Sequence, residues 1–120
     1  MGRPGIVTAE PVALPEHELL ARVFRTLGDA TRLRLLEILL ERGETTQREL
    51  VAAVGAPQPR VSEHLNCLAW CGLVTAERAG RTVAYRILEP RAEQFIAMAR
   101  EFLTDNLAAV GCCTVLDESR

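Results

Sequence analysis

Apolar residues recur at helical spacing in the first third of the chain. From Glu16 onward they fall on one face, and Gly28 ends this pattern; Asp29 is then the predicted N-cap of a second helix, which Gly43 ends. The two apolar stripes consist of Leu19, Leu20, Val23, Phe24 and Leu27, and of Leu33, Leu36, Ile38, Leu39 and Leu40. The pattern therefore predicts two consecutive helices.

A short helix, a tight turn and another helix follow. Thr45 or Thr46 caps the short helix, and Glu49 lies three residues after Thr46, as in a capping box. Pro57 or Pro59 suits the first turn of the next helix, which is predicted to end near residue 71. This stretch therefore has the pattern of a helix-turn-helix.

The residues after Gly72 change to a period of two. The alternation is clearest at Val83, Tyr85 and Ile87, and Ala79 and Gly80 lie where a tight turn belongs. This pattern predicts a β-hairpin.

Pro90 opens a last long helix, whose broad apolar face is made of Phe95, Ile96, Ala99, Phe102, Leu103 and Leu107. The order of elements predicts a mainly α protein with a small β-hairpin, the winged helix-turn-helix. The first and last helices carry apolar faces that one small domain does not easily cover. We expect a two-fold homodimer to bury them, in preference to a monomer that covers them alone.

Composition limits the class of protein and its compartment. The 120 residues, 48% hydrophobic and 25% charged, suffice for one modest core. No apolar run approaches the roughly 20 residues of a membrane span. The first residues are rich in Pro and Gly and lack the apolar core of a signal peptide. We expect a cytoplasmic protein without a membrane partner, with a disordered arm over 1–15, one domain over 16–110 and a tail over 111–120.

Net charge is −2, so the overall composition does not indicate a nucleic-acid partner. The distribution of charge is more informative. Residues 57–86 contain four arginines and two acids, whereas residues 89–120 contain three arginines and six acids. A basic centre suits a surface that faces phosphates, although an ordinary mixed surface explains the charges equally well.

The helix that begins near residue 58 has a polar front. The first turns of a recognition helix contact base edges, and amide, guanidinium and hydroxyl side chains pair with bases or phosphates. The candidate DNA-contacting residues are Gln58, Arg60, Ser62, Glu63, His64 and Asn66 on this helix, with Arg78 and Arg81 beside the turn of the hairpin. A solvated polar face is the alternative, but the hairpin and the order of helices favour DNA.

Cys67 and Cys71 lie four residues apart on the same helix. Side chains at this spacing are neighbours, with Cβ atoms about 5–6 Å apart, so both sulfurs can reach one ion. Free cysteine is often only a small buried hydrophobe. The pair, however, lies to one side of the apolar stripe, near His64, and we therefore prefer metal ligands to core filling.

Two thiolates alone do not make a selective site for a soft metal ion. The other cysteines are Cys112 and Cys113 in the tail, so counting leads to a site made by the recognition helix and the tail. Three sulfurs suit Pb(II) or As(III), and a fourth would suit tetrahedral Cd(II) or Zn(II). His64 is an additional candidate ligand, although a DNA contact or a polar partner suits it better.

The segments "LGDATRLRLL", "VSEHLNCL" and "GLV…GRTVAYRI" resemble the ArsR/SmtB family of metal-responsive repressors. The resemblance covers roughly residues 16–110 and implies homodimers that release operator DNA when metal binds. Cys67 and Cys71 look like the cadmium- and lead-sensing CmtR type, whose third thiolate comes from the C-terminal region of the other subunit. Cys112 is at the matching position, whereas Cys113 is outside that pattern. The third-helix cysteine pair of the arsenic-sensing type and the last-helix histidine of the zinc-sensing type are absent.

The sequence leads to one main hypothesis, a homodimeric transcriptional repressor that Cd(II) or Pb(II) releases from its operator. Three alternatives stay open: As(III), Hg(II) or Zn(II) as the inducer, a thiol redox or persulfide switch, and a structural zinc clamp of all four cysteines. An enzyme is not expected, because no nucleophile–base–orienter arrangement can be recognised.

Overall fold

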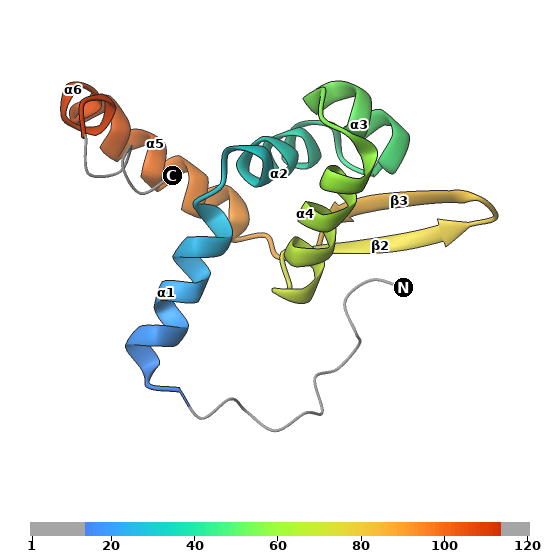
Figure 1. Ribbon diagram of the computed structural model, residues 1–120, viewed down its shortest axis with the longest axis horizontal. Coiled ribbons are helices and arrows are strands. Elements are labelled where there is room, and N and C mark those ends of the chain that lie inside the picture. The colour runs from blue at the N-terminus through green and yellow to red at the C-terminus, as the bar shows by residue number, and fades with distance from the viewer. Residues whose placement is uncertain (1–13, 114–120) are drawn as a thin grey trace. The chain divides into compact units, whose positions relative to one another are not determined.

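The computed structural model describes residues 14–113 and divides the chain after Pro90 into two compact units. Figure 1 labels the helices and strands. The first unit contains helices α1 (Glu16–Leu27), α2 (Ala30–Arg42), α3 (Gln47–Val54) and α4 (Gln58–Trp70), and strands β1 (Thr45–Thr46), β2 (Val74–Ala79) and β3 (Thr82–Ile87). The second contains α5 (Ala92–Asp105) and α6 (Leu107–Gly111).

The predicted winged helix-turn-helix with a small β-hairpin is confirmed, and the bounds of the first four helices match the predicted ones closely. Residues 1–13 of the predicted arm lie outside the described residues. Residues 114–120 of the predicted tail also lie outside them. No helix within residues 14–113 is long and apolar enough to cross a membrane.

The two predicted N-caps are present. The Asp29 side chain accepts a hydrogen bond from the backbone N–H of Arg32 at 3.0 Å at the start of α2. At the start of α3, Thr46 and Glu49 form a full capping box, in which each side chain bonds the other residue's backbone N–H. These bonds satisfy N–H groups that have no partner inside the helix, and each cap contributes about 1 kcal/mol.

The core of the first unit lies between α2, α3, α4 and the sheet. Its fully buried large side chains are Leu35, Leu36, Ile38, Leu39, Leu50, Val61, Leu65, Leu68 and Val74. The predicted α2 stripe omitted Leu35, which is fully buried, and included Leu33 and Leu40, which are only half-buried. Since α2 contacts α3, α4 and β3, its buried face is wider than a single stripe. Each buried leucine contributes about 1.5–3 kcal/mol.

The sheet has a third strand that the sequence did not predict. β1, two residues long, pairs antiparallel with β3, which lies between β1 and β2. In the hairpin Ala79 pairs with Thr82, so the turn is Gly80–Arg81, one residue later than predicted. Gly80 has φ of +62°, and Arg81, like every non-glycine residue within 14–113, lacks a positive φ, which fits a type II′ turn with glycine first.

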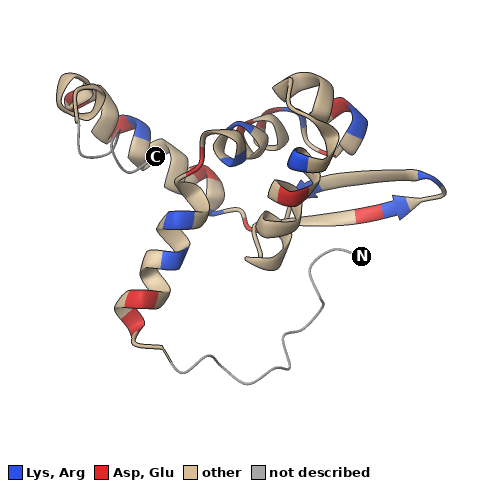
Figure 2. Ribbon diagram, in the orientation of Figure 1, with Lys and Arg blue, Asp and Glu red and all other residues tan. Residues whose placement is uncertain are grey.

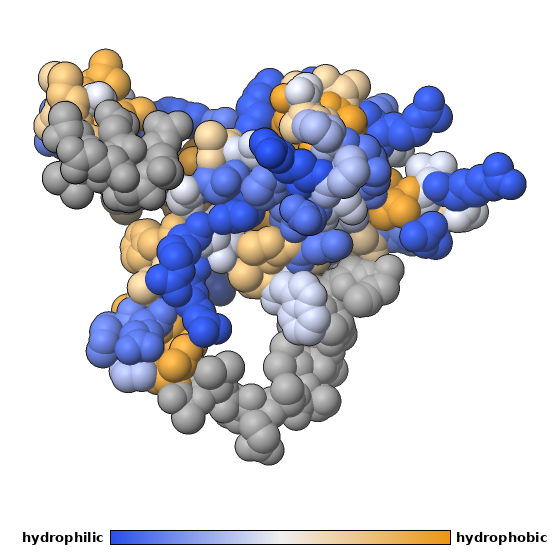
Figure 3. Space-filling view, viewed as in Figure 1, coloured by the Kyte–Doolittle hydropathy of each residue, from blue (hydrophilic) through white to orange (hydrophobic). Residues whose placement is uncertain are grey.

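Helix α1 presents most of its apolar side chains to solvent in the first unit. Its one buried residue is Thr26, whereas Leu19, Leu20, Val23 and Phe24 are exposed, Phe24 to 71%. Hydrophobic atoms are visible on the surface of α1 in Figure 3.

The second unit is not the single long helix that the sequence predicted. It breaks at Asn106, which has φ of −128° and whose side-chain amide donates to the Phe102 carbonyl at 2.9 Å. The asparagine side chain thus donates a hydrogen bond to a backbone carbonyl at the end of α5, as asparagine readily does at helix ends. In the described part of this unit, the exposed large apolar residues are Phe95, Met98, Phe102, Leu103, Leu107 and Val110.

Candidate DNA-reading helix and thiol site

Helix α4 begins where prolines allow it. Pro57 is the N-cap and Pro59 lies in the first turn, where a missing N–H costs nothing. Val61, Leu65 and Leu68 are fully buried and pack the helix against the core. The rest of its surface is therefore available for polar and thiol side chains.

Most of the predicted reading residues lie on the outer surface of the helix-turn-helix and wing. Gln58, Arg60, Glu63 and Asn66 are exposed on α4, and Ser62 is half-buried. Figure 2 shows the basic and acidic residues of these elements, with basic residues at the tip of the hairpin. Arg78 lies on β2 close to the turn, and Arg81 is part of the turn; both side chains are exposed. These side chains are free to meet base edges and phosphates.

His64 is placed differently from the other predicted reading residues. Its side chain is only 17% exposed, and its Nε2 lies 3.8 Å from the Asp29 carboxylate. Its Nδ1 lies 3.2 Å from a guanidinium nitrogen of Arg32. The imidazole therefore has polar partners on α2 and at its N-cap, the second of the two roles expected for it.

The polar groups around Asp29 act on its pKa in opposite directions. Burial raises the pKa, but the hydrogen bond from the Arg32 backbone and the charges of His64 and Arg32 outweigh burial, so the pKa lies below its ordinary value of 3.8. The carboxylate is thus held in its charged form at the junction of α2 and α4.

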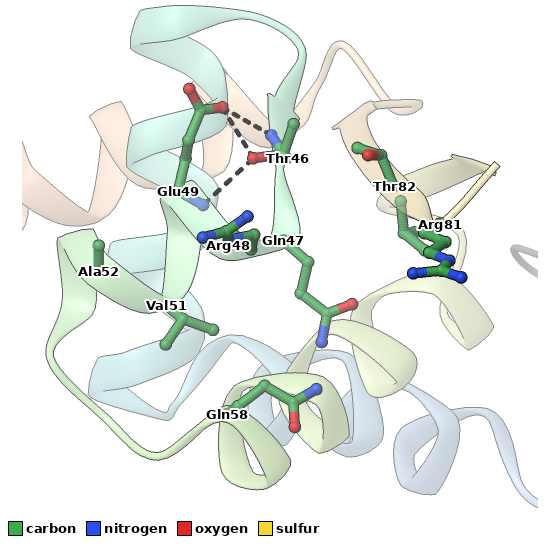
Figure 4. A pocket seen from close by; sticks show the side chains of 10 residues that line it. Thr46, Gln47, Arg48, Glu49, Val51, Ala52, Gln58, Arg81 and Thr82 are labelled. Atoms are coloured by element: carbon green, nitrogen blue, oxygen red, sulfur yellow. Dashed lines mark hydrogen bonds between the residues drawn. The ribbon is translucent and has the colours of Figure 1, made fainter. Parts of the chain in front are cut away.

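A groove of about 870 Å³ lies between the start of α3, the start of α4 and the hairpin. Figure 4 shows Gln47 extending from α3 between Arg48 and Gln58, with Arg81 and Thr82 across from it. The sequence pointed to Gln58 and Arg81 as DNA contacts but not to Gln47, Arg48 and Thr82, which also line this groove. Gln47 and Arg48 belong to the first helix of the motif, which crosses the DNA backbone in helix-turn-helix proteins, and Thr82 belongs to the wing.

Cys67 and Cys71 lie together at the end of α4. Cys71 is the C-cap residue, and its N–H donates to the Cys67 carbonyl at 3.1 Å, so the i, i+4 relation persists to the end of the helix. Both thiols are free; Cys67 is half-buried and Cys71 is exposed. Burial raises the pKa of Cys67 and the adjacent Cys71 raises it further, while Arg32 and a hydrogen bond with Thr26 act in the lowering direction.

Two residues of other helices adjoin the thiol pair. The Thr26 hydroxyl of α1 lies 3.3 Å from the Cys71 sulfur. Arg32 of α2 donates to the carbonyls of Arg25 and Thr26, at 3.0 and 2.7 Å, and thereby holds the last turn of α1. The thiol pair is therefore at the junction of three helices.

The tail cysteines belong to the second unit. Cys112 is the exposed C-cap of α6, and its N–H donates to the Ala108 carbonyl at 3.0 Å, whereas Cys113 is half-buried. Among residues 14–113, no three His, Cys, Asp or Glu side chains are gathered closely enough to hold a metal ion. The donor chemistry of the first unit thus fits two ligands for a thiophilic ion.

Comparison with known proteins gives close relatives. Residues 29–76 match the model of the bacterial regulatory proteins of the arsR family. The chain is 46% identical over 109 residues to the probable mercury resistance operon repressor of Streptomyces lividans, covering 91% of this chain and 86% of that one. It is 44% identical over 70 residues to the regulator CmtR of Mycobacterium tuberculosis, covering 58% of each.

Solved structures agree with the fold. The crystal structure of M. tuberculosis Rv0081 has a TM-score of 0.73 at 33% identity and covers 83% of this chain and 100% of that one. The homodimeric winged helix-turn-helix domain of Mb0332 from Mycobacterium bovis has a TM-score of 0.63 at 28% identity, over 82% of this chain and 92% of that one. The chain belongs to the ArsR family of bacterial regulatory proteins.

Proposed function

We propose that the protein is a homodimeric transcriptional repressor that leaves its operator when a thiophilic metal ion binds Cys67, Cys71 and a thiolate of the tail. One observation carries the proposal: the paired thiols lie on the helix whose front presents exposed Gln58, Arg60 and Glu63. An ion bound to this pair acts directly on the element that meets DNA.

The proposed DNA surface consists of the front of α4, the groove and the wing. Gln58 and Asn66 have the donor and acceptor pairs that suit adenine, and Arg60 suits guanine. Arg48, Arg78 and Arg81 are exposed around them and suit phosphates. Together with the ArsR membership, this arrangement favours major-groove reading by α4 with backbone contacts on both sides.

The homodimer is proposed from the uncovered apolar residues. Phe24 on α1 and Met98 on α5 are exposed to 71% and 70%, and other apolar residues of these helices are exposed with them. Isolated apolar side chains on a surface are ordinary, but rows of them on two helices suit an interface. The relative from M. bovis is described as homodimeric.

The proposed inducers are Cd(II) and Pb(II), held by Cys67, Cys71 and Cys112, with Cys113 as a fourth candidate ligand. Such an ion binds thiolates strongly and would therefore link α4 to the tail. Release then requires that the metal-bound conformation has a lower affinity for the operator than the metal-free one.

Hg(II) is the second candidate inducer. It is favoured by one observation, the similarity to the mercury resistance operon repressor of S. lividans across most of both chains. Hg(II) is a soft ion that two thiolates can bind in a linear arrangement, so the pair on α4 would suffice for it.

The test is a binding titration. An operator is first selected from a random DNA library with metal-free protein, and its affinity is then measured by fluorescence anisotropy with Cd(II), Pb(II), Hg(II), As(III), Zn(II) and, as a hard-ion control, Mg(II). We expect Cd(II) or Pb(II) to weaken binding at least about tenfold, within the usual range of allosteric coupling, and Mg(II) to have no effect. Unchanged affinity with all thiophilic ions would show that the protein is not a metal sensor.

A further inference from the structure

The last turn of α1 is attached to the first unit through polar contacts that include a sensor thiol. Thr26 is 8% exposed and is the only buried residue of α1. Its hydroxyl lies 2.9 Å from the carbonyl oxygen of Arg22 and 3.3 Å from the sulfur of Cys71. Thr26 therefore joins the dimer helix of the proposed function to the end of α4.

The directions of the two hydrogen bonds of Thr26 follow from the single proton of its hydroxyl group. A hydroxyl has one proton, and here it donates to the Arg22 carbonyl, which can only accept. The thiol of Cys71 is then the donor and the Thr26 oxygen the acceptor. The chain of bonds thus runs from Cys71 through Thr26 to the backbone of α1.

A cysteine that binds metal does so as a thiolate and has no proton to donate. The Thr26 oxygen then loses its donor, and two electron-rich atoms face each other. The hydroxyl can turn to donate to the sulfur, but it must then give up the Arg22 carbonyl. Either arrangement changes the contact between α1 and α4.

Arg32 restrains the last turn of α1, so the change in the Thr26 contact acts on this turn. Its guanidinium holds the carbonyls of Arg25 and Thr26, so the turn cannot move away from α2 without losing two more hydrogen bonds. The same guanidinium meets His64 on α4. The attachment of α1 to the reading helix therefore includes a few directional hydrogen bonds, which are either made or broken.

We propose that Thr26 is a positioning residue that transmits the ligand state of Cys71 to the end of α1. Thr26 binds neither metal nor DNA in this account. This role rests on the proposed metal-induced release from DNA. Part of the coupling between metal binding and operator affinity is assigned to the Thr26 hydroxyl group.

The test compares Thr26→Val, which keeps the shape and removes the hydroxyl, with Thr26→Ser, which keeps the hydroxyl. Thr104→Val is the matched control, because the Thr104 hydroxyl of α5 also donates to a carbonyl four residues earlier, that of Arg100, at 3.0 Å. Operator affinity is measured without and with saturating Cd(II), and Cd(II) binding is followed by the sulfur-to-metal absorption band. Thermal unfolding checks that each variant folds.

We expect Thr26→Val to bind Cd(II) with the wild-type absorption band but to lower the metal-induced ratio of operator affinities by about fivefold, the factor that corresponds to one ordinary hydrogen bond. Thr26→Ser and Thr104→Val retain the wild-type ratio. A wild-type ratio in Thr26→Val would overturn the proposal, and so would equal losses in Thr26→Val and Thr26→Ser. Should Thr26→Val not fold, loss of the ratio in Thr26→Ser would equally overturn it. A wild-type protein whose operator affinity is unchanged by Cd(II), Pb(II) and Hg(II) alike would instead contradict the proposed function.

Discussion

The backbone N–H of Cys71 donates to the carbonyl of Cys67 at 3.1 Å, so the last turn of α4 holds both thiols on one flank of the helix. An adjoining face of the same helix packs Val61, Leu65 and Leu68 into the core. An ion bound to the pair therefore pulls on a helix that cannot rotate without disturbing the core.

The tail cysteines should differ in their importance. We predict that Cys112→Ser weakens Cd(II) binding at least about 10- to 100-fold, the range seen when even outer-shell partners of a metal site are lost. Cys113→Ser should have a much smaller effect, since Cys113 is outside the ligand pattern. Competition titrations with a chromophoric chelator measure both affinities, and the reverse order would assign the third ligand to Cys113.

Trp70 should report on the thiol site directly. It is the only tryptophan of the chain, it is 62% exposed, and it precedes Cys71. We predict that adding Hg(II) or Pb(II) quenches its fluorescence with a defined stoichiometry, because a heavy ion then lies close to the indole. Cys71→Ser should abolish the saturable part, and quenching that persists in this variant would mean that the ion binds elsewhere.

Arg48 should contact the DNA backbone from the groove. Arg48→Gln is predicted to weaken binding to all sequences alike and to lower the slope of log affinity against log salt by about one. Arg34→Gln, an exposed arginine of α2 outside the groove, is the control and should leave the slope unchanged. A change in sequence preference with an unchanged slope would instead assign Arg48 to base reading.

Asp29 should make stability depend on pH in the acid range. Burial raises its pKa, but the Arg32 hydrogen bond and the nearby positive charges lower the pKa by more than burial raises it. The folded protein therefore binds this proton less tightly than the unfolded chain does. Its contribution is therefore complete well above pH 3.8 and is lost as pH falls through the lower pKa of the folded state.

Asp29→Asn tests this pH dependence, because asparagine is an equally good N-cap without the charge. Urea unfolding between pH 7 and pH 3 should show a smaller fall in the free energy of unfolding for this variant than for the wild type. Parallel curves for the two proteins would contradict the assignment.

Local signals in the sequence predicted most of the fold. The Asp29 cap and the Thr46–Glu49 box involve residues three apart, so their geometry follows from the helix itself. The strand β1 was missed because a two-residue strand has no period and exists only by pairing with β3. The break at Asn106 was missed because apolar spacing continues across it.

The candidate site was predictable only in part, for a similar reason. The spacing of Cys67 and Cys71 is local and could be seen in the sequence. The contacts of His64 with Asp29 and of Thr26 with Cys71 join residues 35 and 45 positions apart, and no periodicity encodes them. Gln47 and Arg48 were overlooked because their role depends on where the wing lies beside α3.

The most direct test of the account is the ratio of operator affinities without and with saturating Cd(II), measured for the wild type and for Cys67→Ser. We predict that both proteins bind the operator equally well without metal. Cd(II) should then weaken the wild type at least about tenfold and leave Cys67→Ser unchanged. A Cys67→Ser protein that Cd(II) still releases as fully as the wild type would contradict the claim that thiols on the reading helix control DNA binding.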